Sequence, residues 1–354
     1  MDSLTHALLG AAIGESVLGR ETGKKVLAAG AFTALVPDID VFLGLFMSDI
    51  DKLVFHRGIT HSFVFIIFTS PLLGWLCRRA DAFLSRRKAS SRPASASFLQ
   101  WTFLALITQL SHILLDSFTS YGTQIYLPFT SEAIALSTIS IIDPLFTLPL
   151  LLAVSALSLL RRGLPFRHLI STVALLLACL YLGGTIINKL YVEKQFMNAF
   201  SEAGIEVAKT DIKPTLFNNL LWRGIGREQG TDVYHTGYFS LADGKAEIKL
   251  YRLEGHHHRI AGWQSKRGMQ RLRWVSEGFY QIEQHPDGFV FNDLRFGRVS
   301  EFSDDETTPY AFSYLMQPKE DELQVKRIEL NVEPQRERRS LGLLWARIWG
   351  EEQF

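Results

Sequence analysis

Residues 168–187 read His-Leu-Ile-Ser-Thr-Val-Ala-Leu-Leu-Leu-Ala-Cys-Leu-Tyr-Leu-Gly-Gly-Thr-Ile-Ile. As a helix, an apolar run of about 20 residues is long enough to cross the ~30 Å hydrocarbon core of a bilayer. A second long run occupies 139–160, further apolar stretches occupy 59–77 and 98–116, and two weaker ones occupy 3–19 and 24–47. The sequence therefore predicts a multi-pass, membrane-embedded helical domain over residues 1–190.

The apolar stretch 24–47 is expected to be interrupted. Residues 24–36 are too short to span a bilayer alone, and Pro37 lacks the N–H that a continuing helix needs. The apolar pattern resumes at Val41. We therefore expect a broken or re-entrant element, which is tolerated only where protein or a water cavity covers its backbone.

The chain changes character after residue 195, where charged residues become frequent and short alternating segments replace the long apolar runs. Two pairs of such segments flank turn sequences: Val233–Leu241 and Lys245–Leu253 around Asp243-Gly244, and Gly278–Gln284 and Phe289–Phe296 around Pro286-Asp287-Gly288. This pattern is typical of β-hairpins. We expect a β-rich domain over 195–335, so the fold class is mainly α, a multi-pass membrane helical domain with a C-terminal β-rich soluble domain.

Residues 336–354 predict an amphipathic tail helix. Leu341, Trp345 and Trp349 recur at helical spacing beside several arginines. Such a helix either lies on a membrane surface or packs on its own domain, and the sequence favours the two equally.

Composition excludes several classes of protein. The 354 residues carry a net charge of +1, so the chain lacks the excess of positive charge that is typical of nucleic-acid-binding proteins. Both cysteines, Cys77 and Cys179, lie in apolar segments, which argues against a disulfide framework or a cysteine-based zinc site. The first helix begins at once and lacks a basic n-region, so no cleavable signal peptide is expected.

Basic residues predict the orientation in an inner membrane. Arginine and lysine concentrate in three loops, at about 20–25, 78–92 and 161–167, which the positive-inside rule places in the cytoplasm. This assignment puts the C-terminal domain on the extracytoplasmic side. The histidines and acids at the ends of the apolar segments fall on that same outer face.

Those histidines and acids form four short patches: Thr5-His6, Pro37-Asp38-Ile39-Asp40, His56-Arg57-Gly58-Ile59-Thr60-His61, and His112 with Asp116. An Asp at the centre of a membrane helix costs roughly 2.5–3.5 kcal/mol, so such groups suggest a function. Imidazole and carboxylate are the ligands of zinc-type sites. We expect a divalent metal, zinc in the first instance, held by His6, Asp38, Asp40, His56, His61, His112 and Asp116.

Each patch taken alone has a simpler interpretation. An Asp-x-Asp after a proline is more often a helix cap, and Arg57 would then pair with Asp38 or Asp40. His6 would be an interfacial histidine. Asp143 is either a further ligand or a helix-start charge.

Two groups outside the patches also have simple interpretations. His256–His258 is more often a solvated turn than a metal site. Glu15 is expected to pair with Arg20 or Lys24.

The motifs also carry a resemblance. Met1–Gly10, Pro37–Asp40, His56–Ser62 and Ser111–Asp116, in this order, resemble the YdjM-like family of membrane-bound metal-dependent hydrolases. That family is distantly similar to zinc-dependent phospholipase C and P1-type nucleases, in which His and Asp from helices hold a zinc cluster. The resemblance covers about residues 1–145, with Asn219-x-x-Trp222-Arg223 as a less specific signature beyond it. No His-x-x-x-Glu pair accompanies His112, so one or two metal ions are expected rather than three.

The function expected is metal-dependent hydrolysis at the outer membrane–water interface, with a phosphoester or lipid-like substrate. Asp40 would act as general base, and Arg57 would stabilise developing charge. One alternative is a non-enzymatic membrane protein whose metal is structural and whose outer β domain binds a partner. A metal transporter ranks last, because its ligands would lie near the bilayer midplane.

Overall fold

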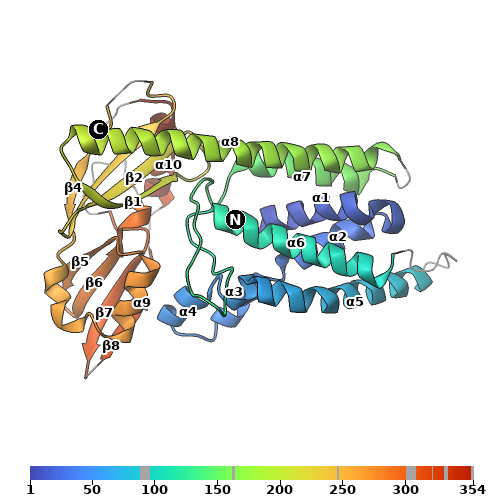
Figure 1. Cartoon of the computed structure of the whole chain (residues 1–354), viewed down its shortest axis with the longest axis horizontal. Helices are drawn as coiled ribbons and strands as arrows, with labels where there is room; N and C mark the ends of the chain where they lie inside the picture. The colour runs from blue at the N-terminus through green and yellow to red at the C-terminus, as the bar shows by residue number, and fades with distance from the viewer. Residues whose placement is uncertain are drawn as a thin grey trace. The chain divides into compact units, whose positions relative to one another are not determined.

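The computed structural model describes residues 1–87, 96–161, 164–244, 247–299, 308–320, 322–330 and 334–351 (Figure 1). Two compact units emerge from the contacts between residues. The first contains 1–45, 55–188 and 216–219, and the second contains 46–54, 189–215 and 220–354. The long helix α8 (Phe166–Glu202) contributes residues to both.

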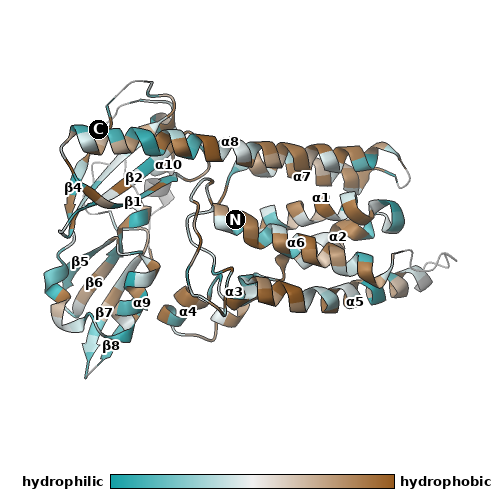
Figure 2. Ribbon diagram, viewed as in Figure 1, coloured by the Kyte–Doolittle hydropathy of each residue, from teal (hydrophilic) through white to brown (hydrophobic). Residues whose placement is uncertain are grey.

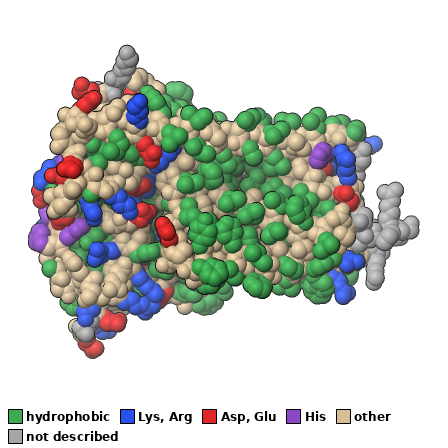
Figure 3. All heavy atoms as spheres, viewed as in Figure 1, with side chains coloured by type: hydrophobic (Ala, Val, Ile, Leu, Met, Phe, Trp, Pro, Cys, Tyr) green, Lys and Arg blue, Asp and Glu red, His purple; other side chains and the backbone are tan. Residues whose placement is uncertain are grey.

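The first unit is helical. Its elements are α1 (Ser3–Thr22), α2 (Lys25–Leu35), α3 (Ile39–Gly44), the 3-10 turn η1 (Ile59–His61), α5 (Phe63–Arg87), α6 (Phe98–Phe118), α7 (Pro144–Leu159) and the first part of α8. Among described residues, the segments Phe63–Ser85, Phe98–Phe118 and Phe166–Glu202 are long and apolar enough to cross a membrane. Hydrophobic residues dominate these helices (Figure 2), and hydrophobic side chains cover much of the visible face of the helical unit (Figure 3). The prediction of a mainly α membrane fold is confirmed.

Helix breaks and close helix contacts bring the motif-bearing elements together. α2 ends at Leu35 and α3 begins at Ile39, so the chain turns at Pro37 as expected. Gly10 of α1 lies so close to Gly30 of α2 that a Cβ on either would collide with the other backbone. The Thr33 and Thr108 hydroxyls, 2.8 Å apart, then join α2 to α6. Small residues and interhelical hydrogen bonds are the usual means of packing helices in lipid.

A buried ion pair joins α1 to α8. Arg167 donates to both carboxylate oxygens of Glu15, at 2.8 and 2.9 Å, and its remaining nitrogen donates to the Leu157 and Leu160 carbonyls. The expectation that Glu15 pairs with Arg20 or Lys24 is therefore wrong. The partner comes from a helix far along the chain, and its planar guanidinium bonds both oxygens of the carboxylate.

The second unit contains two four-stranded antiparallel sheets. One has the order β1 (Val207–Pro214), β2 (Leu221–Glu228), β3 (Val233–Ser240) and β4 (Tyr251–Glu254); the other has β5 (Tyr280–His285), β6 (Gly288–Asp293), β7 (Ser313–Lys319) and β8 (Glu322–Arg327). The expected pairing of β5 with β6 is confirmed, and β3 pairs with β4, but β4 begins at Tyr251 and the described residues 247–250 before it form no strand, contrary to the expected strand Lys245–Leu253. Lys245, in the first hairpin, lies outside the described residues. The remaining elements are η2 (His257–Trp263), α9 (Arg267–Val275), η3 (Leu294–Phe296), α10 (Pro334–Ile348) and α4 (Asp49–Phe55).

The C-terminal part of α8 supplies the core beneath the first sheet. Phe196 and Phe200 pack with Trp222 and Phe239, and all four side chains are buried. A Cβ at Gly224 would collide with the Phe196 ring, so the close approach of helix and strand requires glycine there. Trp222 is thus a core residue of the second unit.

The tail helix α10 packs on its own unit and also leaves an apolar face exposed. Arg347 donates to both carboxylate oxygens of Asp243, at 2.6 and 2.8 Å, and Ile348 is buried. Leu341 and Trp345 of this helix, and Trp349 just after it, are nevertheless 46%, 63% and 55% exposed. This arrangement is unusual, because the charged side chain faces inward while the aromatic ones face outward.

Candidate metal centre

The motif residues converge within the first unit from four elements. His6 lies in the first turns of α1, where Asp2 caps the helix by accepting the Thr5 N–H. Asp38 and Asp40 lie at the start of α3, and His56 and His61 lie on either side of the turn into η1. His112 and Asp116 are one helical turn apart on α6. The four patches, which are far apart in the sequence, therefore lie together because these four elements pack against one another.

His112 is at the centre of the cluster and is fully buried. Its Nδ1 lies 2.7 Å from the carbonyl oxygen of Ala34. Because a carbonyl can only accept, Nδ1 carries the hydrogen and Nε2 presents its lone pair. Nε2 lies 3.2 Å from Nε2 of His61, 3.4 Å from Oδ1 of Asp38 and 3.6 Å from Oδ2 of Asp116. A backbone carbonyl that orients the imidazole in this way is the usual partner of a metal-ligating histidine.

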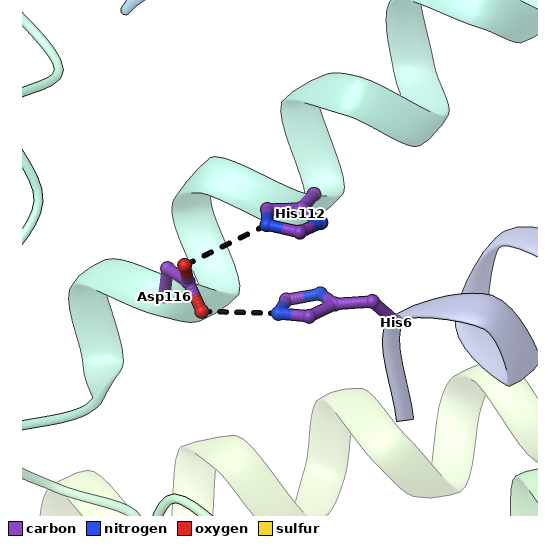
Figure 4. A group of neighbouring side chains, drawn as sticks. All are labelled: His6, His112 and Asp116. Atoms are coloured by element: carbon purple, nitrogen blue, oxygen red, sulfur yellow. Dashed lines mark hydrogen bonds and ion pairs between the residues drawn. The ribbon is translucent and has the colours of Figure 1, made fainter. Parts of the chain in front are cut away.

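His6 and His112 meet at Asp116 (Figure 4). Nε2 of His6 lies 3.0 Å from Oδ1 of Asp116, and the His6 ring stacks on the His112 ring with centroids 3.6 Å apart. Nδ1 of His6 is buried and has no hydrogen-bond partner among the described residues. His6, His112 and Asp116 form one group whose candidate ligand atoms all lie within 4.8 Å of one another.

Asp38, His61 and His112 form a second such group, so the two groups share His112. Nε2 of His61 lies 3.7 Å from Oδ1 of Asp38. Asp38 occupies the N-cap position of α3, but its side chain makes no capping hydrogen bond and instead accepts the Ser3 hydroxyl at 3.0 Å. The helix-cap interpretation of Asp38 is therefore wrong.

Asp40 and His56 lie beside these groups rather than in them. Oδ2 of Asp40 accepts the backbone N–H of Arg57 at 2.8 Å and lies 3.4 Å from Nδ1 of both His56 and His61. Asp40 therefore contacts the ring nitrogen of His61 opposite the one that faces His112 and Asp38. Asp40 is buried, whereas the His56 side chain is 34% exposed. Such a carboxylate orients an imidazole ligand and raises its basicity.

Arg57 introduces a buried guanidinium. Its Nε lies 2.9 Å from Oδ2 of Asp116, and the same guanidinium donates to the Asp116 carbonyl at 3.3 Å and to the Thr119 hydroxyl at 2.7 Å. Its partner is therefore Asp116 and not Asp38 or Asp40. Arg57 adopts a φ of 55°, a left-handed conformation that is uncommon for a residue with a Cβ. The contacts to Asp116 and Asp40 hold this backbone in place.

The N-terminal ammonium of Met1 also contacts Asp116 and is buried with it. This carboxylate thus lies against two cations, Arg57 and the ammonium.

The other candidate ligands lie apart. Asp143 caps α7 by accepting the Leu145 and Phe146 N–H groups and also accepts the Tyr181 hydroxyl at 2.7 Å, so it is the helix-start charge and not a ligand. His257 stacks on Tyr280 with ring centroids 3.8 Å apart, in the turn after β4.

The donor set fits a divalent transition metal such as zinc. Neutral imidazoles and carboxylates from helices suit this ion, and two of the imidazoles already have a second partner, His112 in the Ala34 carbonyl and His61 in Asp40. Sequence reasoning did not identify Ala34 or Thr119. The Thr119 hydroxyl is detectable in principle as an Asp-x-x-Thr pattern, whereas the Ala34 carbonyl leaves no signal in the sequence.

Comparisons with known proteins agree with the motif order. The sequence profile of the YdjM inner membrane protein family matches residues 1–192. The chain is 30% identical to YfhP of Bacillus subtilis (strain 168) over 165 residues, 44% of this chain and 46% of YfhP. It is 35% identical to the inner membrane protein YbcI of Escherichia coli (strain K12) over 119 residues, 34% of this chain and 61% of YbcI. The chain thus spans less than two thirds of either relative, and no solved structure matches it significantly.

Proposed function

Because the chain belongs to the YdjM inner membrane protein family, we propose that its buried His/Asp cluster is the metal centre of a membrane-bound hydrolase. Its substrate would be a phosphoester or lipid-like ester at the outer membrane–water interface. The C-terminal unit would lie on the extracytoplasmic side, as the basic loops indicate.

The observation that carries this proposal is the orientation of His112. Its Nδ1–H is used by the Ala34 carbonyl, so the lone pair on Nε2 is directed at Asp38, His61 and Asp116. A histidine serving only as packing would not need three more potential ligands around its free nitrogen. Zinc bound there would act as a Lewis acid and lower the pKa of water in the site to about 7.

Residues around the metal centre would bind the substrate and accept the proton. Arg57 would bind an anionic oxygen of the substrate and stabilise charge as the ester bond to the leaving oxygen breaks. His56 is the most exposed imidazole of the cluster, and Asp40 contacts its Nδ1. Asp40 and His56 together would therefore accept the proton of the attacking water, with Asp40 holding the ring and balancing its charge.

Exposed apolar side chains beside the acids favour a lipid-like substrate. On α3, Val41 and Phe42 are 53% and 69% exposed, and Leu45 just after it is 71% exposed. Asp40, from the same short helix, is buried. A substrate with an anionic head group and a hydrocarbon tail would match this arrangement, because one end needs Arg57 and the other needs an apolar surface.

The test is metal analysis combined with a hydrolase screen on the full chain in lipid nanodiscs. We expect stoichiometric zinc after reconstitution, and zinc-dependent cleavage of a phosphodiester or phospholipid that a chelator abolishes. A protein that binds no divalent metal would refute the proposal. Bound metal without turnover of any phospholipid or phosphodiester would favour the second candidate.

That second candidate is a structural metal in a non-enzymatic membrane protein. It is favoured by the burial of His6, His61 and His112, which are at most 1% exposed. A closed shell of protein ligands stabilises a fold, whereas catalysis requires an open coordination position. The most exposed members of the cluster, Asp38 and His56, are where such an opening would be found.

A further inference from the structure

The chain leaves the first unit between two motifs of the metal centre. Residues 46–54, which include most of α4, belong to the second unit, although Asp40 before them and His56 after them belong to the first. A sequence-based division at residue 190 does not anticipate this excursion. The C-terminal unit therefore holds a segment whose two ends continue directly into candidate site residues.

Ion pairs and a hydrogen bond connect α4 to α9 and β8 of the second unit. Oδ1 of Asp51 lies 2.8 Å from the guanidinium of Arg267 and also contacts that of Arg271, both on α9. Oδ2 of Asp49 accepts the backbone N–H of Arg327 on β8 at 3.1 Å. This hydrogen bond lowers the pKa of Asp49, so the carboxylate stays ionised and bonded at neutral pH.

Apolar contacts reinforce these pairs. Ile50 and Leu53 pack against the core cluster that includes Met269 and Leu272 of α9. Phe46, at the start of the segment, is 90% exposed. The attachment therefore lies in α4 itself.

The segment forms a loop that closes at the metal centre. Asp40, before the loop, accepts the N–H of Arg57, after the loop, at 2.8 Å. The same carboxylate contacts His56 and His61, and the Arg57 side chain contacts Asp116. The loop is short, and the hydrogen bond between Asp40 and Arg57 joins its two ends. A shift of α4 would therefore first change the positions of Asp40 and Arg57.

We propose that Asp51, Arg267 and Arg271 are positioning residues through which the C-terminal unit sets the geometry of Asp40 and Arg57 in the metal centre. The inference rests on the proposed function, since it requires that the centre bind metal. It gives the C-terminal unit a role in the chemistry of a site to which it contributes no ligand.

The experiment measures zinc affinity of the full chain in nanodiscs by competition with a chromophoric chelator. We expect Asp51→Ala, and Arg267→Ala with Arg271→Ala, to raise the Kd for zinc roughly tenfold, the lower range for residues that orient ligands indirectly. Exchanging the charges, with Asp51→Arg, Arg267→Asp and Arg271→Asp together, should restore much of the affinity. Asp287→Ala, which removes an exposed carboxylate from the turn between β5 and β6, is the matched control and should change nothing.

A second variant separates positioning from stability. Four Gly/Ser residues inserted after Met47 keep every contact of α4 but slacken its connection to Asp40, and zinc affinity should fall as in Asp51→Ala. Wild-type affinity in both the inserted and the Asp51→Ala proteins would overturn the inference while leaving the metal centre intact. Absence of zinc from the wild-type protein would instead overturn the proposed function, and this inference with it.

Discussion

His112 donates its Nδ1–H to the carbonyl oxygen of Ala34 at 2.7 Å, so α2 determines which nitrogen of a histidine on α6 faces the acids of the site. The carbonyl is near the end of α2, where the last carbonyl groups of a helix lack partners within it. The break at Pro37 thus provides both the partner for His112 and the turn that carries Asp38.

Because His112 belongs to both candidate groups, its removal should affect metal content most. We expect His112→Ala to lower bound zinc to background and His61→Ala to lower it strongly, with little further loss in the double mutant because ligands of one site are not additive. Elemental analysis of protein that still inserts checks this. His6→Ala should leave half the metal if two ions bind. Full zinc occupancy in His112→Ala would remove the shared-site hypothesis.

Arg57→Lys should impair turnover far more than metal binding. Lysine keeps the positive charge beside Asp116 but loses the planar fork that also reaches the Thr119 hydroxyl. We expect kcat to fall about 10²–10³-fold, as when one oxyanion donor is lost, with zinc content unchanged. Arg252→Lys, on an exposed part of β4, is the control. Equal kcat in Arg57→Lys and wild type would contradict the assigned role.

Asp40→Asn should distinguish proton acceptor from ligand. Asparagine can still accept the Arg57 N–H but loses the charge that supports His56 and His61. Since Asp40 lies outside both candidate groups, we expect zinc to be retained with roughly tenfold weaker affinity and hydrolysis to be abolished. Loss of metal together with activity would make Asp40 a ligand instead.

Membrane orientation can be tested with single cysteines in a chain whose Cys77 and Cys179 are replaced by alanine. Arg252, whose side chain is 58% exposed, is a suitable reporter position for the C-terminal unit. An impermeant maleimide on intact cells should label Arg252→Cys and spare Glu21→Cys in the first basic loop. The reverse labelling would invert the topology.

The exposed face of α10 predicts contact with lipid. Trp345 and Trp349 are 63% and 55% exposed, and tryptophan is favoured at membrane–water interfaces. A photo-crosslinking amino acid at Trp345, in the full chain in nanodiscs, should give lipid adducts detectable by mass spectrometry. The same group at Tyr251, an exposed position on β4, serves as the reference. Protein adducts only, or no excess over Tyr251, would show that a protein surface or solvent covers this face.

Sequence patterns predicted the elements of the fold wherever local chemistry decides them. The apolar runs form helices, and α2 ends just before Pro37. The turn sequences Asp243-Gly244 and Pro286-Asp287-Gly288 lie between strands that pair, β3 with β4 and β5 with β6. Strands β1 and β2 were not anticipated individually; their residues Ile212 and Trp222 pack in one core with Phe196 and Phe200 of α8, a contact that no local pattern reveals.

For the candidate site, too, the sequence determined some features and the tertiary structure decided others. The motifs by themselves determined which histidines and aspartates to consider, because ionisable groups beside long apolar runs are costly unless they are used. Only the tertiary structure decided that His112 is shared by two groups, that Asp40 lies behind His61, that Arg57 pairs with Asp116, and that Glu15 pairs with Arg167. The physical reason is that helix periodicity specifies which side chains share a face, whereas partners across helices depend on how closely the helices approach. Here that approach depends on Gly10 against Gly30 and on the break at Pro37.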